Sequence, residues 1–144
     1  MSNSISIGVA FLDQDIVGAN IVSASTVYAT QQLGYTNGAY GTVTQSGNKA
    51  TGVTLNKTAG TITTSNAQMA PSAEVAFVVT NSQVSALDTV IVNIASGATA
   101  TFAYVIAVVT VTDGAFTINI SNVSNNAYSD TLKINFSILH IASA

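Results

Sequence analysis

Apolar and polar residues alternate with a period of two over most of the chain after Gly41. The alternation is clearest in four segments, 73–81, 88–95, 114–122 and 129–141. Their apolar members are Val75, Phe77, Val79, Val90, Val92, Ile94, Phe116, Ile118, Ile120, Leu132, Ile134, Phe136 and Ile138. Successive side chains of a strand point to opposite faces, so this pattern predicts half-buried antiparallel strands with one face on a core.

Turn-forming pairs separate these segments. They are Gly47-Asn48, Asn56-Lys57, Ser65-Asn66, Ser96-Gly97, Asp113-Gly114 and Asn125-Asn126. Asp113-Gly114 lies between two apolar runs and predicts a two-residue hairpin. The spacing gives about eight strands and an all-β fold, an antiparallel β-sandwich or jelly-roll-like domain. An immunoglobulin-like strand order remains equally open.

One apolar run, residues 101–112, has apolar residues on both faces. We expect it to be a central strand of its sheet or to lie at a subunit interface. The run is far shorter than the roughly 20 residues that a membrane-spanning helix needs. No membrane partner is therefore expected.

The first 40 residues differ from the rest of the chain. A short apolar stretch, Ile5–Leu12, precedes a mixed segment, and Asn37-Gly38 is a strong turn signal. A short helix and an extended arm both fit this segment. We therefore divide the chain into an N-terminal arm or oligomerisation segment (1–40) and a β-sandwich domain (41–144). The first residues lack the basic region of a signal peptide, so none is expected.

The composition indicates a surface with unusually few charged residues. Charged residues make up 6% of the chain, against about 25% in an average soluble domain. Threonine, serine and asparagine replace them, and these side chains solvate a surface without repelling other copies. Interface cores are depleted of charge, so this surface suits a protein covered by copies of itself or by a larger assembly. Three lysines and no arginine form no basic patch, which argues against nucleic acid as a partner.

Candidate catalytic and metal-binding residues are few, and each has a structural explanation. His140 is the only histidine and continues the face of Phe136 and Ile138, which predicts a packed or interface side chain. Asp13 and Asp15 form a D-x-D pair, but calcium prefers six to eight oxygen ligands and no further carboxylate is near in sequence. The remaining aspartates fall at strand ends or turns, where aspartate binds backbone groups: Asp88, Asp113 and Asp130. We predict no catalytic, metal or cofactor site.

The sequence gives little support for binding of nucleotides, sugars or ice. No phosphate-binding glycine loop occurs, and tryptophan is absent. A tyrosine cluster in the N-terminal region is expected to serve packing or contact: Tyr28, Tyr35 and Tyr40. Threonine triplets (42/44, 61/63, 99/101, 110/112) resemble ice-binding arrays but lack a regular period. A polysaccharide-cleaving carboxylate pair is conceivable, but no spacing singles one out.

Three stretches resemble a domain of tailed-phage structural proteins. They are "GTVTQSGNKATGVTLNKTAGTITT" (41–64), "FVVTNSQVSALDTVIVNIASG" (77–97) and "INFSILHIASA" (134–144). Relatives carry a Cys-Gly pair where this chain has Ala59-Gly60, a departure to which no chemistry is attached. The resemblance covers the last 100 or so residues and rests on strand motifs.

The resemblance implies a non-enzymatic virion component, assembled in the host cytoplasm. We expect a capsid decoration (cement) protein, a homotrimer that binds the major capsid protein and stabilises the head. The head domain of a short trimeric fibre that binds a receptor is the alternative.

Overall fold

The structure is a computed structural model that describes residues 26, 27, 29 and 31–141. Eight strands follow a short 3-10 helix, η1 (Asn37–Ala39), and no α-helix occurs among the described residues. The strands are β1 (Tyr40–Thr44), β2 (Val53–Thr54), β3 (Ala59–Thr63), β4 (Glu74–Thr80), β5 (Thr89–Ser96), β6 (Tyr104–Thr112), β7 (Ala115–Asn122) and β8 (Lys133–Leu139). The described residues from 34 to 141 belong to one compact unit. The predicted N-terminal arm, residues 1–40, lies mostly outside the described residues.

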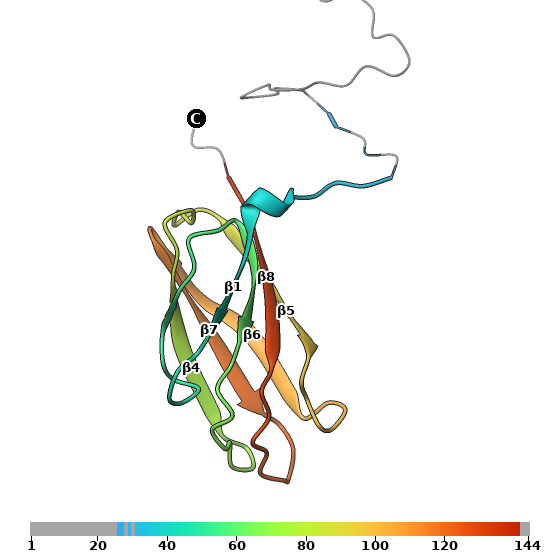
Figure 1. The fold of residues 1–144 in the computed structure, drawn as a ribbon, viewed down its shortest axis with the longest axis vertical. Coiled ribbons are helices and arrows are strands. Elements are labelled where there is room, and N and C mark those ends of the chain that lie inside the picture. The colour runs from blue at the N-terminus through green and yellow to red at the C-terminus, as the bar shows by residue number, and fades with distance from the viewer. Residues whose placement is uncertain (1–25, 28, 30, 142–144) are drawn as a thin grey trace, which may run out of the picture. The chain divides into compact units, whose positions relative to one another are not determined.

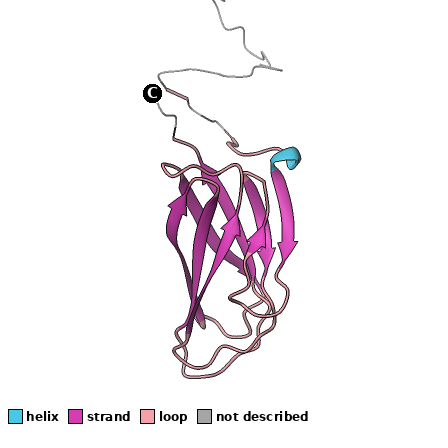
Figure 2. Ribbon diagram, turned by 90° about the vertical axis from the view of Figure 1, so that its left-hand side faces the viewer, coloured by secondary structure: helices cyan, strands magenta, loops and turns pink. Residues whose placement is uncertain are grey.

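The strands form two four-stranded sheets that pack face to face (Figure 1), in the orders β1-β3-β8-β5 and β2-β4-β7-β6. This confirms the all-β sandwich. Four strand pairs are antiparallel, and two, β1–β3 and β2–β4, are parallel. The parallel pairs arise because the chain crosses to the other sheet between β1 and β3, and again between β2 and β4. The loops gather at the two ends of the strands (Figure 2).

The core is made by the alternating apolar residues, as the sequence predicted. The inner residues of β7 and β8 are at most 2% exposed: Phe116, Ile118, Ile120, Ile134, Phe136 and Ile138. Phe116 and Phe136 meet between the sheets, with ring centroids 5.3 Å apart and planes tilted by 56°, a favourable geometry for two aromatic rings. Apolar burial between the two sheets is therefore the main source of stability.

Strand β6, which contains most of the apolar run 101–112, is not the central strand that was one of its two expected positions. It lies at the edge of its sheet, because β7 is its only neighbour among the described strands. The other expected position, a subunit interface, stays a prediction. The Asp113-Gly114 hairpin that joins it to β7 is confirmed, with Thr112 opposite Ala115. Apolar residues on both faces therefore mark an edge strand here, and its outward-facing Val105 is 54% exposed.

Two of the three described glycines with positive φ, Gly97 and Gly114, lie in contrasting surroundings. Gly97, in the β5–β6 loop, has φ +98, and a Cβ there would lie 2.0 Å from the carbonyl oxygen of Thr131. Gly114, in the hairpin, has φ +80, and a Cβ there would have no neighbour within 4 Å. The first glycine therefore serves backbone conformation and a close contact between loops, and the second serves conformation alone.

We predict that Gly97→Ala destabilises the fold much more than Gly114→Ala. The left-handed conformation costs a non-glycine residue roughly 1–2 kcal/mol, and Gly97→Ala adds a backbone clash of about 1–3 kcal/mol or more. Urea unfolding of both variants measures the difference. Equal losses would show that the contact between the β5–β6 and β7–β8 loops does not constrain Gly97.

Candidate functional site

Most of the few charges lie inside the sandwich or at its ends. The chain has three lysines and six acidic residues, and two of these nine, Asp13 and Asp15, fall outside the described residues. Of the remaining seven, Lys49, Asp88 and Asp130 are buried. The exposed or half-buried ones are Lys57, Glu74, Asp113 and Lys133. The surface of the sandwich is therefore even poorer in charge than the composition indicates.

The outer face of the β4–β7–β6 sheet is nearly uncharged. We call it the valine face: Glu74, Ala76, Val78, Thr80, Val105, Ala107, Val109, Ala115, Thr117, Asn119 and Ser121. The strand register places Ala76, Asn119 and Ala107 in one row across it. Val78, Val105 and Val109 are 46%, 54% and 57% exposed. Glu74, at one end of β4, is its only charged residue, so a partner could cover the face at little desolvation cost.

The outer face of the other sheet carries a polar, uncharged row. Thr42, Thr61, Asn135 and Asn93 lie side by side in the register. The Thr61 hydroxyl donates to Asn135 Oδ1 at 2.6 Å, and the Tyr40 hydroxyl lies 2.7 Å from Thr61 Oγ1. Two of the threonine triplets, 42/44 and 61/63, pair with each other here, whereas Thr110 and Thr112 belong to the opposite sheet. The triplets thus form no single array.

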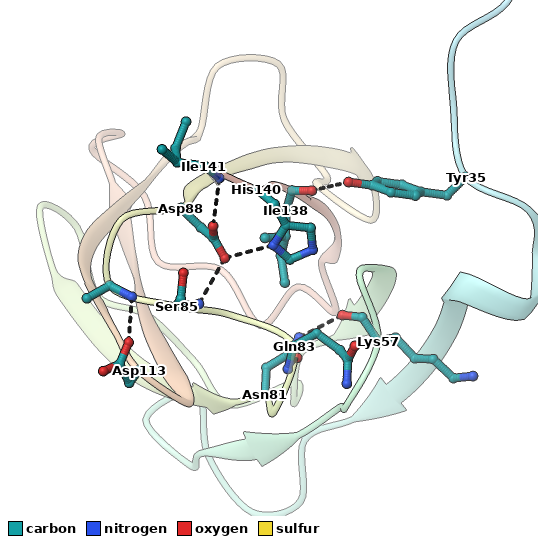
Figure 3. Close-up of polar contacts among 11 residues, drawn as sticks. Tyr35, Lys57, Asn81, Gln83, Ser85, Asp88, Asp113, Ile138, His140 and Ile141 are labelled. Carbon is teal, nitrogen blue, oxygen red and sulfur yellow. Dashed lines mark hydrogen bonds and ion pairs between the residues drawn. The ribbon is translucent and has the colours of Figure 1, made fainter. Parts of the chain in front are cut away.

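Asp88 joins two segments at one end of the sandwich, the β4–β5 loop and the residues after β8 (Figure 3). Its carboxylate accepts the backbone N–H groups of Ser85 at 2.8 Å and Ile141 at 3.0 Å, and lies 2.9 Å from His140 Nδ1. The Ser85 N–H is the largest cause that lowers the pKa of Asp88 to about 2, with Ile141 and His140 adding to it against the opposing effect of burial. Asp88 thus ties the β4–β5 loop to the residues after β8.

The position of His140 differs from its prediction. It lies one residue beyond β8, and its side chain is 48% exposed, so it does not continue the buried face of Phe136 and Ile138. An Asp–His pair supplies two members of a catalytic triad. Among the described residues, no serine or threonine hydroxyl hydrogen-bonds to the imidazole. The arrangement fits a clamp on the C-terminal end of β8 better than a nucleophile site.

The other two turn aspartates also bind backbone groups, as predicted. Asp113 accepts the N–H of Ala86 at 2.8 Å, on the loop that Asp88 holds. At the opposite end of the sandwich, Asp130 accepts the N–H of Thr99 at 2.8 Å and its hydroxyl at 2.5 Å. The three carboxylates are therefore divided between the two ends and serve as loop anchors.

Lys49 is a buried residue that sequence reasoning missed. Its ammonium donates to the carbonyl oxygens of Ser65 and Asp130. Burial lowers its pKa, and the charge of Asp130 opposes that shift. The hydroxyl of Tyr104, near Asp130, has no hydrogen-bond partner within the described part, and burial followed by the Asp130 charge raises its pKa to about 12. No sequence signal marks Lys49, because both of its partners are backbone carbonyls.

The remaining candidate residues do not converge on a ligand site. Within the described residues, no three histidine, aspartate or glutamate side chains lie close enough to hold a metal ion. Asp13, Asp15 and Tyr28 lie outside the described residues. Tyr35 donates its hydroxyl to the carbonyl of Ile138 and so contacts the sandwich. Among the described residues, the candidate functional features are therefore exposed surfaces for contact with other proteins, rather than a pocket into which several polar side chains point.

Comparison of the chain with known proteins finds no relatives. No known protein family, curated protein or solved structure matches the chain. Within the described residues, no helix has the length and apolar character needed to cross a membrane.

The lowered pKa of Asp88 predicts a pH-dependent effect of Asp88→Asn. Folded Asp88 has a pKa of about 2, below its ordinary 3.8, so its ionised form stabilises the fold above about pH 4, and this stabilisation is lost as the pH falls through about 2. The variant should have a lower urea midpoint than the parent at pH 6, and the gap should shrink toward pH 2. A gap of constant size would mean that the ionisation of Asp88 does not contribute.

Proposed function

We propose that the protein is a structural component of a tailed-phage virion. In this proposal it is a capsid decoration protein that binds the major capsid protein as a homotrimer and cements neighbouring capsid subunits. The resemblance of residues 41–64, 77–97 and 134–144 to phage structural domains supports the proposal. The absence of a convergent catalytic constellation among the described residues is compatible with a mechanical role.

The valine face is the observation that carries the proposal. Three valines on it are about half exposed, and covering each one would contribute roughly 1 kcal/mol. Most of the other side chains on this face are small alanines, threonines and a serine, so another protein surface can approach the sheet closely. Attraction of this kind is apolar and short-ranged, and it does not depend on ion pairs.

The buried charges add to this argument. The three buried charged residues hydrogen-bond to loops at the two ends of the strands and do not lie on the outer faces of the sheets: Lys49, Asp88 and Asp130. A monomer in solution gains colloidal stability from exposed charge. A decoration protein gains instead from faces that can be covered without stripping water from lysine or glutamate.

One observation favours the second candidate, a receptor-binding fibre head. Phe102, in the β5–β6 loop, is 90% exposed and has φ +60. This backbone conformation is unfavourable for a bulky residue, and the loop that imposes it presents an aromatic ring to solvent. Exposed loop aromatics are frequent anchors in recognition. Copy number separates the candidates: many copies per capsid fit decoration, and a few copies fit a fibre.

We predict that the protein stays bound to capsids across a salt series from about 0.1 to 1 M, because its contacts are apolar rather than ionic. The measurement is the amount retained on purified virions after sedimentation, relative to the major capsid protein. A protein released at moderate salt would contradict the proposed mode of binding.

A charge placed on the valine face should weaken this binding. Val78→Lys introduces an ammonium at an exposed position of β4 that the fold tolerates but a covered face does not. Asn125→Lys, on the exposed β7–β8 loop, is the matched control with the same change in net charge. We expect at least a roughly 10-fold loss of capsid affinity for Val78→Lys alone. Equal affinities would place the contact surface elsewhere.

A further inference from the structure

The free edge of β6 is unusually receptive to another strand. Among the described strands only β7 pairs with β6, so the other edge of this nine-residue strand offers unpaired backbone groups. Edge strands are commonly protected by lysine, proline or other charged side chains. Tyr104–Thr112 contains none of these. A bulge between Val108 and Thr110 leaves Tyr104–Val108 as the regular part of the edge.

The core is also incompletely covered beside this edge. Ile106, Val108 and Val111 face inward but are only partly buried, whereas the inner residues of the adjacent β7 are fully buried. A further strand next to β6 would cover these side chains if its own inward face were apolar. It would also extend the valine face if its outward face carried small residues.

The other sheet edges are less suitable. β2 has two residues and β1 has five. β5 carries a central asparagine, Asn93, and its own bulge near Ser96. Strand β6 is therefore the longest and least polar open edge of the described part.

The N-terminal sequence has the pattern that such a strand requires. Ile5, Ile7, Val9 and Phe11 alternate with Ser6, Gly8 and Ala10, and residues 4–12 contain neither charge nor proline. One face of a strand with this sequence would be entirely apolar, and the other would carry small side chains. These are the inward and outward faces that the edge of β6 lacks.

We propose that residues 4–12 of one copy add as an edge strand to β6 of a second copy. This inference rests on the part of the proposed function in which copies of the chain associate, and not on binding to a capsid. An arm of one copy on the edge of the next is a head-to-tail contact, and such contacts close into rings when the rotation between neighbouring copies closes. A ring of three copies would match the proposed homotrimer.

Cysteine cross-linking tests the proposal directly, because the chain has no cysteine of its own. Ala10→Cys protein is mixed with isotopically labelled Ala107→Cys protein and oxidised. Ala107 points outward from β6, beside the expected outward face of the arm, so a disulfide-linked pair of mixed mass should form. Ser6→Cys, used in place of Ala10→Cys, tests whether the arm pairs with β6 in a shifted register.

Ala76→Cys is the matched control. It lies in the same row of the valine face as Ala107, two strands further from the edge. Two strand spacings add about 10 Å, beyond the reach of a disulfide. Equal cross-linking of the arm to Ala76→Cys and to Ala107→Cys protein would overturn the proposal. A double variant that forms only an intrachain disulfide at low concentration would show that the arm adds to its own copy, which also contradicts it.

A second pair of variants tests the alternation. Val9→Asp places a carboxylate on the inward face of the arm, and Ala10→Asp places the same charge on the outward face. We expect self-association to weaken at least about 10-fold more for Val9→Asp, measured by sedimentation of the full chain. Equal effects would contradict strand addition. If the cross-link forms but the protein does not bind capsids, the proposed function fails and the strand addition stands. If no cross-link forms and the Val9→Asp protein still binds capsids, the strand addition fails and the proposed function stands.

Discussion

The fold depends on apolar contact between the inner faces of β7 and β8. These two strands are flanked on both sides in their sheets and bury every inward side chain, and Phe116 packs against Phe136 between them. The edge strands β5 and β6 complete the core only in part, since most of their inward residues remain partly exposed: Val92, Ile94, Ile106, Val108 and Val111. The sandwich is therefore well closed in the middle and open along one side.

The sparse charges reinforce this arrangement from the ends. Asp88 and Asp113 hold the β4–β5 loop, and Lys49 and Asp130 hold the opposite loops. Charge used in this way supports strand ends where backbone groups would otherwise lack partners. As a result, the broad faces of both sheets carry hydroxyls, amides and valines, and little opposes contact with another copy.

The sequence predicts the core and the hairpin turn but not the pairing of distant strands. Alternation identified the inward residues of β4, β5, β7 and β8, because one buried face imposes a period of two. The same signal did not place β6 at its edge, because apolar residues on both faces suit a central strand and an uncovered edge alike; the alternative expectation, a subunit interface, stays a prediction. The contacts of Lys49 and His140 could not be predicted, since their partners lie up to 81 and 52 residues away in sequence.

The proposed function requires that charge-poor faces of one copy are covered by other copies of the chain in the homotrimer. Sedimentation velocity of the full chain, from low to high micromolar concentration in about 0.1 and 1 M salt, tests it most directly. We expect a discrete oligomer that persists or strengthens at high salt, because apolar burial holds it together. A chain that stays monomeric throughout this range would contradict the proposed self-association.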